Sequence, residues 1–231
     1  MVDTKVLIGI PTEEYGRRAD FYDYFNLLEK PANTMVMFSH DRSPAHNRNI
    51  IVEQALIHDC THVLFVDDDM AFKSGALHQL LAHDKDIVTG LYLRRDYPHQ
   101  PLAFDFMDDD GKCLYMYLND GDSGLKPIVA AGLGFCLVKT EVFKKMEKPY
   151  FRLGELESDQ WCDDIGFFHR VKTTTDVKSY VDLDCKVGHI GTLIIWPTYE
   201  KEMWLTGYDT NGKGMISTPQ IHPYKVYAKE S

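Results

Sequence analysis

The chain has 231 residues, of which 44% are hydrophobic and 26% charged, proportions that are ordinary for a soluble globular protein. Its formal net charge of −10 argues against a broad electrostatic grip on nucleic acid, although it leaves room for a local basic groove. The five cysteines include no CxxC pair, which favours a reducing compartment and no structural zinc. We find neither a signal segment nor an apolar run near the roughly 20 residues of a membrane helix, and therefore expect a cytoplasmic protein without stable membrane insertion.

The first 95 residues alternate between strand and helix patterns. The order is a strand over 5–12, a helix over 17–29, a strand over 34–39, a helix over 45–58, a strand from 63, a short helix around Leu77–Leu81 and a strand over 86–93. We expect Ser74 to cap the short helix. Ser43 followed by Pro44 is typical of a helix N-cap and first turn. This alternation predicts an α/β fold, a doubly wound sheet with helices on both faces.

Three aspartates directly follow the third strand. Val63–Val66 is a short apolar run of the kind found in strands buried on both faces, and Asp67, Asp68 and Asp69 come at its carboxyl end. Open α/β sheets place their ligands at that end. Because side chains alternate along a strand, we expect Asp67 and Asp69 to point the same way and Asp68 to point the opposite way. Two converging carboxylates repel each other, and a hard divalent cation relieves that repulsion.

A second aspartate triplet serves as a comparison. Asp108–Asp110 is followed by Gly111 and lies between two runs of period two, which indicates a hairpin turn over the stretch 102–118. The triplet at 67–69 has neither Gly nor Pro beside it. We therefore interpret the first triplet as a site and the second as a turn.

The second half of the chain has a different character. We expect an apolar, glycine-bearing strand over 127–138, a short helix capped by Thr140, a helix over 165–172 and a late strand over 180–187. The last 30 residues are rich in turn residues and give no clear assignment. We predict one domain over 1–231, with a nucleotide-sugar-binding half (1–100), an acceptor and catalytic half (101–200) and a C-terminal segment of unknown role (201–231).

The order of these features resembles the glycosyltransferases of the GT-A fold, most closely the large second family of nucleotide-sugar transferases. The resemblance rests on the following segments: Ile8–Thr12 at the first strand, Arg48-Asn49 at a helix start, Phe65–Asp69 as a DxD motif, Ala131–Phe135, Asp163–Arg170 as an acidic pair before an aromatic helix, and Val187–Gly191 as a closing histidine segment. The family's acidic pair is usually Glu-Asp, whereas this chain has Asp-Asp.

The resemblance implies sugar transfer from a nucleotide diphosphate sugar, with a UDP-sugar favoured, assisted by Mn²⁺ or Mg²⁺. Asp69 would bind the metal, Asp67 the ribose or a metal-bound water, and His189 would add an imidazole ligand that favours Mn²⁺. Donor binding would involve Pro11, Thr12, Asp41, Arg48, Asp67 and Asp68. Asp164 is the expected general base of an inverting reaction, because the first turn of a helix favours its ionised form, and Asp163 is the second carboxylate of the catalytic pair. The alternative is that the two acids only cap the helix, and we expect one of them to do so.

Other functions also fit parts of the pattern. A metal-dependent phosphohydrolase or nuclease also needs clustered carboxylates, and a non-catalytic nucleotide-sugar-binding module would not need Asp164. The acceptor remains open among a glycan, a small molecule and a hydroxylated DNA base of the kind that viruses carry, in which case the compartment would be the host cytoplasm. The sequence leaves the oligomeric state open.

Overall fold

The computed structural model of the protein describes residues 4–12, 19–40, 43–153, 163–209 and 215–219. A central sheet of seven strands has the order β2-β1-β3-β10-β5-β11-β8. Its strands are β1 (Val6–Pro11), β2 (Thr34–Ser39), β3 (His62–Val66), β5 (Ile87–Leu91), β8 (Leu125–Ile128), β10 (Phe135–Lys139) and β11 (Ser179–Lys186). The sheet is mixed: β1, β2 and β3 are parallel, β10 runs against both of its neighbours, and β11 is again parallel to β5. The predicted α/β class with a mixed, doubly wound sheet is confirmed.

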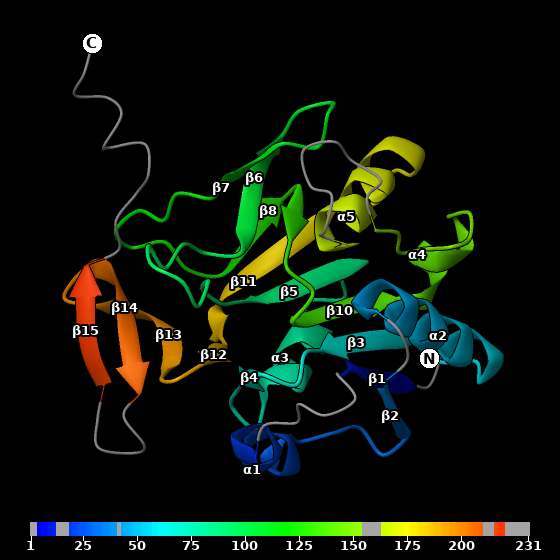
Figure 1. The fold of residues 1–231 in the computed structure, drawn as a ribbon, viewed down its shortest axis with the longest axis horizontal. Helices are drawn as coiled ribbons and strands as arrows, with labels where there is room; N and C mark the ends of the chain where they lie inside the picture. The colour runs from blue at the N-terminus through cyan, green and yellow to red at the C-terminus, as the bar shows by residue number, and fades with distance from the viewer. Residues whose placement is uncertain (1–3, 13–18, 41–42, 154–162, 210–214, 220–231) are drawn as a thin grey trace.

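Helices cover both faces of this sheet (Figure 1). The helix α2 (Pro44–Ile57) packs on the face that carries Leu7, Val63 and Phe65, whereas α3 (Ala76–Ala82) packs against β5, β10 and β11 on the other face. The approach of α2 is close, because a Cβ atom added at Gly9 would lie 2.2 Å from Ile51 Cγ2. The period-two alternation of strand side chains thus divides the core into two layers.

The first half follows the sequence prediction closely. The helix α1 (Ala19–Leu27) and β2 fall where the pattern placed them, and Ser43 caps α2 by accepting a hydrogen bond from the His46 backbone N–H at 3.2 Å. The predicted cap of α3 at Ser74 is wrong, because the N-cap is Gly75 and carries no side-chain hydrogen bond. Thr140 is likewise the first residue of α4 (Thr140–Lys144) rather than its cap, and its hydroxyl donates to the Cys60 carbonyl at 2.7 Å.

The expected strand over 127–138 is three strands. It divides into β8, β9 (Ala130–Ala131) and β10, which pair in two different sheets. The strand β9 joins β6 (Ala103–Met107) and β7 (Cys113–Tyr115) in a three-stranded sheet, and the β6–β7 connection over Asp108–Gly111 is the predicted hairpin turn. The break falls at residues 132–134, which lie beside the candidate site.

The C-terminal part forms a further sheet of five strands, in the order β15-β14-β13-β12-β4. Its strands are β4 (Met70–Ala71), β12 (Gly188–Ile190), β13 (Ile194–Glu200), β14 (Met203–Asp209) and β15 (Met215–Pro219). Figure 1 shows β13, β14 and β15 on the side of the molecule opposite α2, with β12 between them and the central sheet. Through β4 and β12, this sheet is joined to the acidic segment at 67–69.

The remaining long helix, α5 (Asp163–Thr174), packs against β9 and begins at the candidate site. Its inward residues Ile165, Phe168 and Val171 are buried, as the sequence predicted. No helix among the described residues is long and apolar enough to cross a membrane.

Candidate functional site

The three aspartates at 67–69 lie in a turn and not on a strand. The strand β3 ends at Val66, the backbone N–H of Met70 bonds the Asp67 carbonyl, and β4 begins at Met70. The expectation that Asp67 and Asp69 share one face is therefore wrong in its premise, because strand alternation stops at Val66. The two carboxylates contact different guanidinium groups. Asp67 is paired with Arg48, and Asp69 is paired with Arg95.

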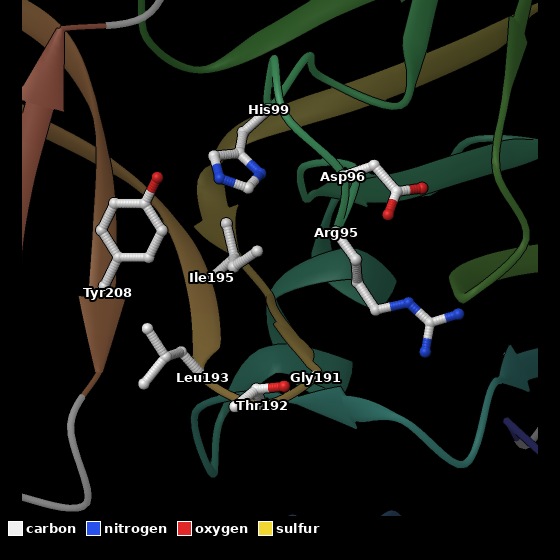
Figure 2. Close-up of a pocket in the computed structure, with 8 residues that line it drawn as sticks. All are labelled: Arg95, Asp96, His99, Gly191, Thr192, Leu193, Ile195 and Tyr208. Carbon is white, nitrogen blue, oxygen red and sulfur yellow. The ribbon is translucent and has the colours of Figure 1, made fainter.

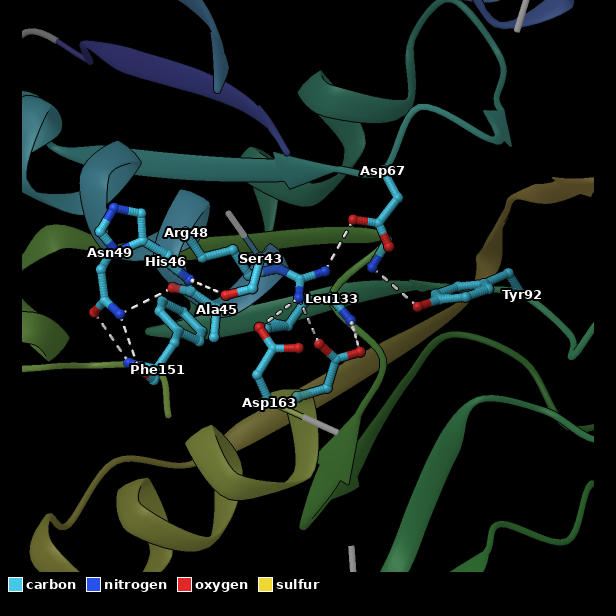
Figure 3. A network of polar contacts seen from close by, with 12 residues as sticks. Ser43, Ala45, His46, Arg48, Asn49, Asp67, Tyr92, Leu133, Phe151 and Asp163 are labelled. Carbon is cyan, nitrogen blue, oxygen red and sulfur yellow. Dashed lines mark hydrogen bonds and ion pairs between the residues drawn. The ribbon is translucent and has the colours of Figure 1, made fainter. Parts of the chain in front are cut away.

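Arg48 is the centre of the acidic site (Figure 3). Its side chain is only 4% exposed and lies between three carboxylates that come from two segments far apart in the sequence. Nη2 is 2.9 Å from Asp67 Oδ1, and Nη1 is 2.6 Å from Asp163 Oδ2 and 3.0 Å from Asp164 Oδ1. These carboxylates hold the pKa of Arg48 well above its usual value against the opposing effect of burial. The cluster is a fixed arrangement of one cation and three acids.

Asp163 and Asp164 occupy the first turn of α5, as predicted, but their environments differ. Asp163 is buried and bonded to Arg48. Asp164 keeps 20% of its side chain exposed, and its Oδ2 accepts a hydrogen bond from the Leu133 backbone N–H at 3.1 Å. Asp164 is therefore the member of the pair that a ligand can reach.

Burial and neighbouring acids make Asp164 an unusually weak acid. Loss of hydration raises its pKa from the ordinary 3.8 to about 7, with Arg48 opposing and with Asp163 and Asp67 adding to the rise. The sequence argument from the helix N-terminus predicted the opposite direction, because it counted only the favourable dipole. Loss of hydration outweighs that dipole at this position. A carboxylate with a pKa near 7 is suited to accept a proton at neutral pH.

Asp69, His189 and Arg95 form a second group beside the first. Asp69 Oδ2 lies 3.0 Å from Arg95 Nη1 and 3.4 Å from His189 Nε2. His189 Nδ1 is 2.8 Å from the carbonyl oxygen of Leu93, so in the neutral ring Nδ1 carries the proton and Nε2 presents its lone pair toward Asp69. The sequence predicted that Asp69 and His189 would meet, and the structure brings them together.

Asp69 and His189 supply two of the ligands that a divalent cation would need. A histidine that donates one ring N–H to a backbone carbonyl and turns the other nitrogen toward a carboxylate has the outer hydrogen bond usual for metal-ligating histidines. Asp67 lies close enough to Asp69 and His189 for both to act on its charge, although burial is the main cause of its raised pKa. Among the described residues, no three or more His, Cys, Asp or Glu side chains lie close enough together to hold a metal ion. A cation here would need Asp67 to approach or a ligand to supply oxygens.

The predicted donor-binding residues are only partly brought together. Thr12 and Asp68 hydrogen-bond each other at the carboxyl ends of β1 and β3, and Pro11 is buried as the last residue of β1. Arg48 does not face an open pocket as expected, because its charge is engaged by the three carboxylates. Asp41 lies outside the described residues.

Two positioning residues carry roles that sequence reasoning missed. Asn49 Oδ1 accepts hydrogen bonds from the backbone N–H groups of Tyr150 (2.7 Å) and Phe151 (3.1 Å), while its Nδ2 donates to the Phe151 carbonyl. Tyr92 is buried and its hydroxyl accepts from the Gly134 N–H at 2.9 Å. The glycines in the segment Ala131–Phe135 were the sequence signal for this close contact. A Cβ atom at Gly132 would lie 2.0 Å from the Tyr92 hydroxyl, so only glycine leaves room for the tyrosine.

A pocket of about 580 Å³ adjoins the second group (Figure 2). The loop after β5, with Arg95 and His99, forms one wall, and the turn at 191–193 with Tyr208 of β14 forms the other. Arg95 is shared between the pocket and the Asp69 group. The pocket thus opens beside the acidic site.

Comparison with known proteins gives structural likeness only. No protein-family model and no curated protein sequence matches the chain. The structure is similar to the crystal structure of protein A197 from STIV, with a TM-score of 0.61 and 19% identity over 85% of this chain and 92% of that one. It is also similar to S. aureus TarS 1-349 in complex with UDP-GlcNAc, with a TM-score of 0.52 and 13% identity. That match covers 78% of this chain but only 56% of TarS 1-349. The fold is GT-A-like.

Proposed function

We propose that this protein is a metal-dependent glycosyltransferase that moves a sugar from a nucleotide diphosphate sugar, with UDP favoured, to an acceptor hydroxyl. One observation carries the proposal: acids from two distant segments, Asp67 after β3 and Asp163-Asp164 at the start of α5, converge on Arg48 at the carboxyl edge of the central sheet. That edge is where open α/β sheets bind nucleotides. The structural likeness to TarS 1-349, whose crystal structure contains UDP-GlcNAc, supports the same donor class.

In this proposal Asp164 is the general base. The acceptor oxygen attacks the anomeric carbon as its proton passes to the Asp164 carboxylate, and the bond from that carbon to the diphosphate oxygen breaks with its electron pair leaving on the diphosphate. A single displacement of this kind inverts the anomeric centre. The pKa of Asp164 near 7 supports the role, since a base works best when its pKa is close to the working pH.

Arg48 and Asp163 position the base. Arg48 is buried and contacts Asp164 from within the protein, so the remaining exposed part of Asp164 can face a ligand. Asp163 takes the shortest contact with Arg48 and fixes the guanidinium in place. The Leu133 N–H orients the second carboxylate oxygen of Asp164. A base held by contacts to both of its carboxylate oxygens loses little freedom when the substrate binds, which is how positioning lowers a barrier.

Asp69 and His189, with Asp67 or its bound water, are the residues that would hold Mn²⁺ or Mg²⁺. This ligand set combines a carboxylate oxygen with an imidazole nitrogen. It suits Mn²⁺ better than Mg²⁺, because Mg²⁺ prefers oxygen ligands alone. A cation bound there would neutralise negative charge on the departing diphosphate. Thr12 and Asp68 lie at the neighbouring strand ends, and in this proposal they contact the nucleotide together with Pro11.

The test is a thermal-shift and calorimetry screen of UDP, GDP and dTDP with and without Mn²⁺, followed by measurement of UDP release from UDP-GlcNAc. We expect UDP to raise the melting temperature only when Mn²⁺ is present, and slow Mn²⁺-dependent release of UDP. Stabilisation by none of the nucleotides would contradict the proposal. Cleavage of simple phosphate esters or DNA without preference for a nucleotide sugar would favour the phosphohydrolase or nuclease instead.

A further inference from the structure

The pocket beside the Asp69 group is built partly from β13 and β14, which follow the last of the sequence motifs along the chain. Tyr208 comes from β14, and Ile195 is paired with it across the β13–β14 ladder. The opposite wall is the loop that follows β5. The volume of about 580 Å³ lies within the range of about 300–1,000 Å³ that is usual for small-molecule sites.

The aromatic side of the pocket consists of two rings in contact with each other. The rings of His99 and Tyr208 meet edge to face, with centroids 5.3 Å apart and planes at 73°. His99 Nδ1 lies 2.9 Å from the carbonyl oxygen of Arg94 and donates to it, which fixes the imidazole. Figure 2 shows both rings beside the pocket, with Ile195 between the two walls. A tyrosine offers an apolar ring face and a polar hydroxyl together.

The polar groups of the pocket are mixed in character. Arg95 supplies donors, Asp96 supplies acceptors, and the Thr192 hydroxyl supplies both. Arg95 is paired with Asp69, and Asp96 Oδ2 lies 3.8 Å from Arg94 Nη2, so each of the two charges has an opposite charge beside it. Among the described residues that line the pocket, Arg95 is the only arginine or lysine. This set matches a ligand with many hydroxyl groups and no net charge better than it matches a phosphate-bearing one.

The pocket is connected directly to the candidate metal residues. His189 lies in β12, and the turn that lines the pocket follows β12 at once, with Gly191 N–H bonded to the Leu193 carbonyl at 3.0 Å. The backbone N–H of Ile190 donates to the Asp69 carbonyl at 2.7 Å. A molecule in the pocket would therefore lie next to the groups that we assign to the diphosphate.

We propose that this pocket binds a sugar unit of an uncharged glycan acceptor, with the Tyr208 ring against the C–H face of the sugar and with Arg95, Asp96 and Thr192 bonding its hydroxyls. The proposal rests on the glycosyltransferase function proposed above and narrows the acceptor class. A DNA acceptor is less compatible with the pocket, because its phosphates would meet a lining with one arginine and no lysine.

The experiment is saturation-transfer NMR on the full chain with the methyl glycosides of glucose, galactose, mannose and N-acetylglucosamine. We expect at least one glycoside to bind wild-type protein. Tyr208→Leu, which keeps an apolar side chain in the strand, should weaken that binding by at least about tenfold, and Tyr208→Phe by no more than about threefold, because the ring face is retained. Tyr117→Ala, which removes a half-exposed tyrosine that does not line the pocket, should leave binding unchanged.

Melting temperatures show whether each variant is folded, and His99→Ala gives a second test of the same wall if Tyr208→Leu does not fold. Binding of none of the glycosides by wild type, or equal binding by wild type and by the folded pocket variants, would overturn the proposal. Displacement of a bound glycoside by a short single-stranded oligonucleotide, with tighter oligonucleotide binding, would also overturn it. UDP release from UDP-GlcNAc by wild type separates the two proposals, since a protein that binds glycosides through Tyr208 but never turns over a nucleotide sugar refutes only the proposed function.

Discussion

The two charged groups of the site differ in how their cations are held. In the Arg48 group the guanidinium is buried and surrounded by three carboxylates, one from the turn after β3 and two from α5, so this cation is part of the folded core. In the Asp69 group Arg95 is 44% exposed and comes from a loop, whereas Asp69 and His189 are largely covered. A buried pair is costly to break, and an exposed pair contributes little.

This difference assigns separate tasks to the two groups. The Arg48 group has its geometry fixed before any ligand arrives, which suits the positioning of a base. In the Asp69 group the exposed side chain of Arg95 can move away from Asp69 at a small cost in free energy. Such a group suits a metal ion and a diphosphate that bind and are then released. The predictions below test this division, in order from the largest expected effect to the smallest.

Removal of the buried cation should have the largest effect. Arg48→Met leaves Asp67, Asp163 and Asp164 close together without their shared cation, and we expect a loss of about 3–5 kcal/mol in the free energy of unfolding. Urea denaturation measures it. Arg48→Lys is the matched control, which keeps the charge but loses the planar fork, and it should lose less. A loss below about 1 kcal/mol for Arg48→Met would show that the cluster does not hold the fold together.

The candidate metal ligands should affect binding more than stability. Asp69→Asn and His189→Gln should each weaken Mn²⁺-dependent UDP binding by more than about tenfold, since loss of even an outer-shell partner costs a metal site about 10–100-fold. Isothermal titration calorimetry with Mn²⁺ and UDP measures this. The variant His78→Gln, which changes an exposed histidine on α3, is the control. Unchanged affinity in both ligand variants would refute the metal site.

The pH dependence should report Asp164. Catalysis needs the ionised form, so kcat should rise with pH through about 7, or through a lower value when a bound cation favours ionisation. Stability should move in the opposite sense. Because the pKa is raised from 3.8 on folding, the stabilising contribution of protonated Asp164 is complete below about 4 and is lost as the pH rises through about 7. The stability of Asp164→Asn relative to wild type should therefore increase between pH 4 and pH 8. Denaturation at several pH values checks this, and a pH-independent difference would contradict the raised pKa.

Arg95 should have the smallest effect. Arg95→Gln removes the exposed partner of Asp69, so it should change the free energy of unfolding by less than about 1 kcal/mol. Since a competing cation is lost, Mn²⁺ should bind up to about fivefold more tightly. Titration with Mn²⁺ alone measures this. Weaker Mn²⁺ binding would mean that Arg95 supports the metal site rather than competing for it.

The sequence predicted the first half of the fold well because its local signals agreed with its tertiary contacts. Ser43 and Pro44 marked the start of α2, and the apolar run of β3 was buried on both faces. The meander β13–β15 was missed because its signals are weak: the turn between β13 and β14 uses Lys201 and Glu202 at φ of 50° and 63°, where glycine or asparagine would be expected.

The residue types of the candidate site were also predictable, but their partners were not. The motif order singled out Asp67, Asp164 and His189 without showing that Arg48 would lie between three carboxylates. Arg48 and Asp163 are 115 residues apart, and a contact over that separation produces no local pattern in the sequence from which it could be predicted. The raised pKa of Asp164 could not be foreseen either, because loss of hydration depends on burial that only the folded chain defines.

The most direct test of the account compares Asp164→Asn with Asp163→Asn in the rate of sugar transfer or UDP release from UDP-GlcNAc under saturating Mn²⁺. The account predicts that Asp164→Asn lowers kcat by roughly 10²–10⁴-fold while UDP affinity stays near the wild-type value. Asp163→Asn should mainly lower stability, because it removes the 2.6 Å contact with Arg48. Equal kcat values in Asp164→Asn and wild type would contradict the account, and a loss of kcat confined to Asp163→Asn would assign the base to Asp163.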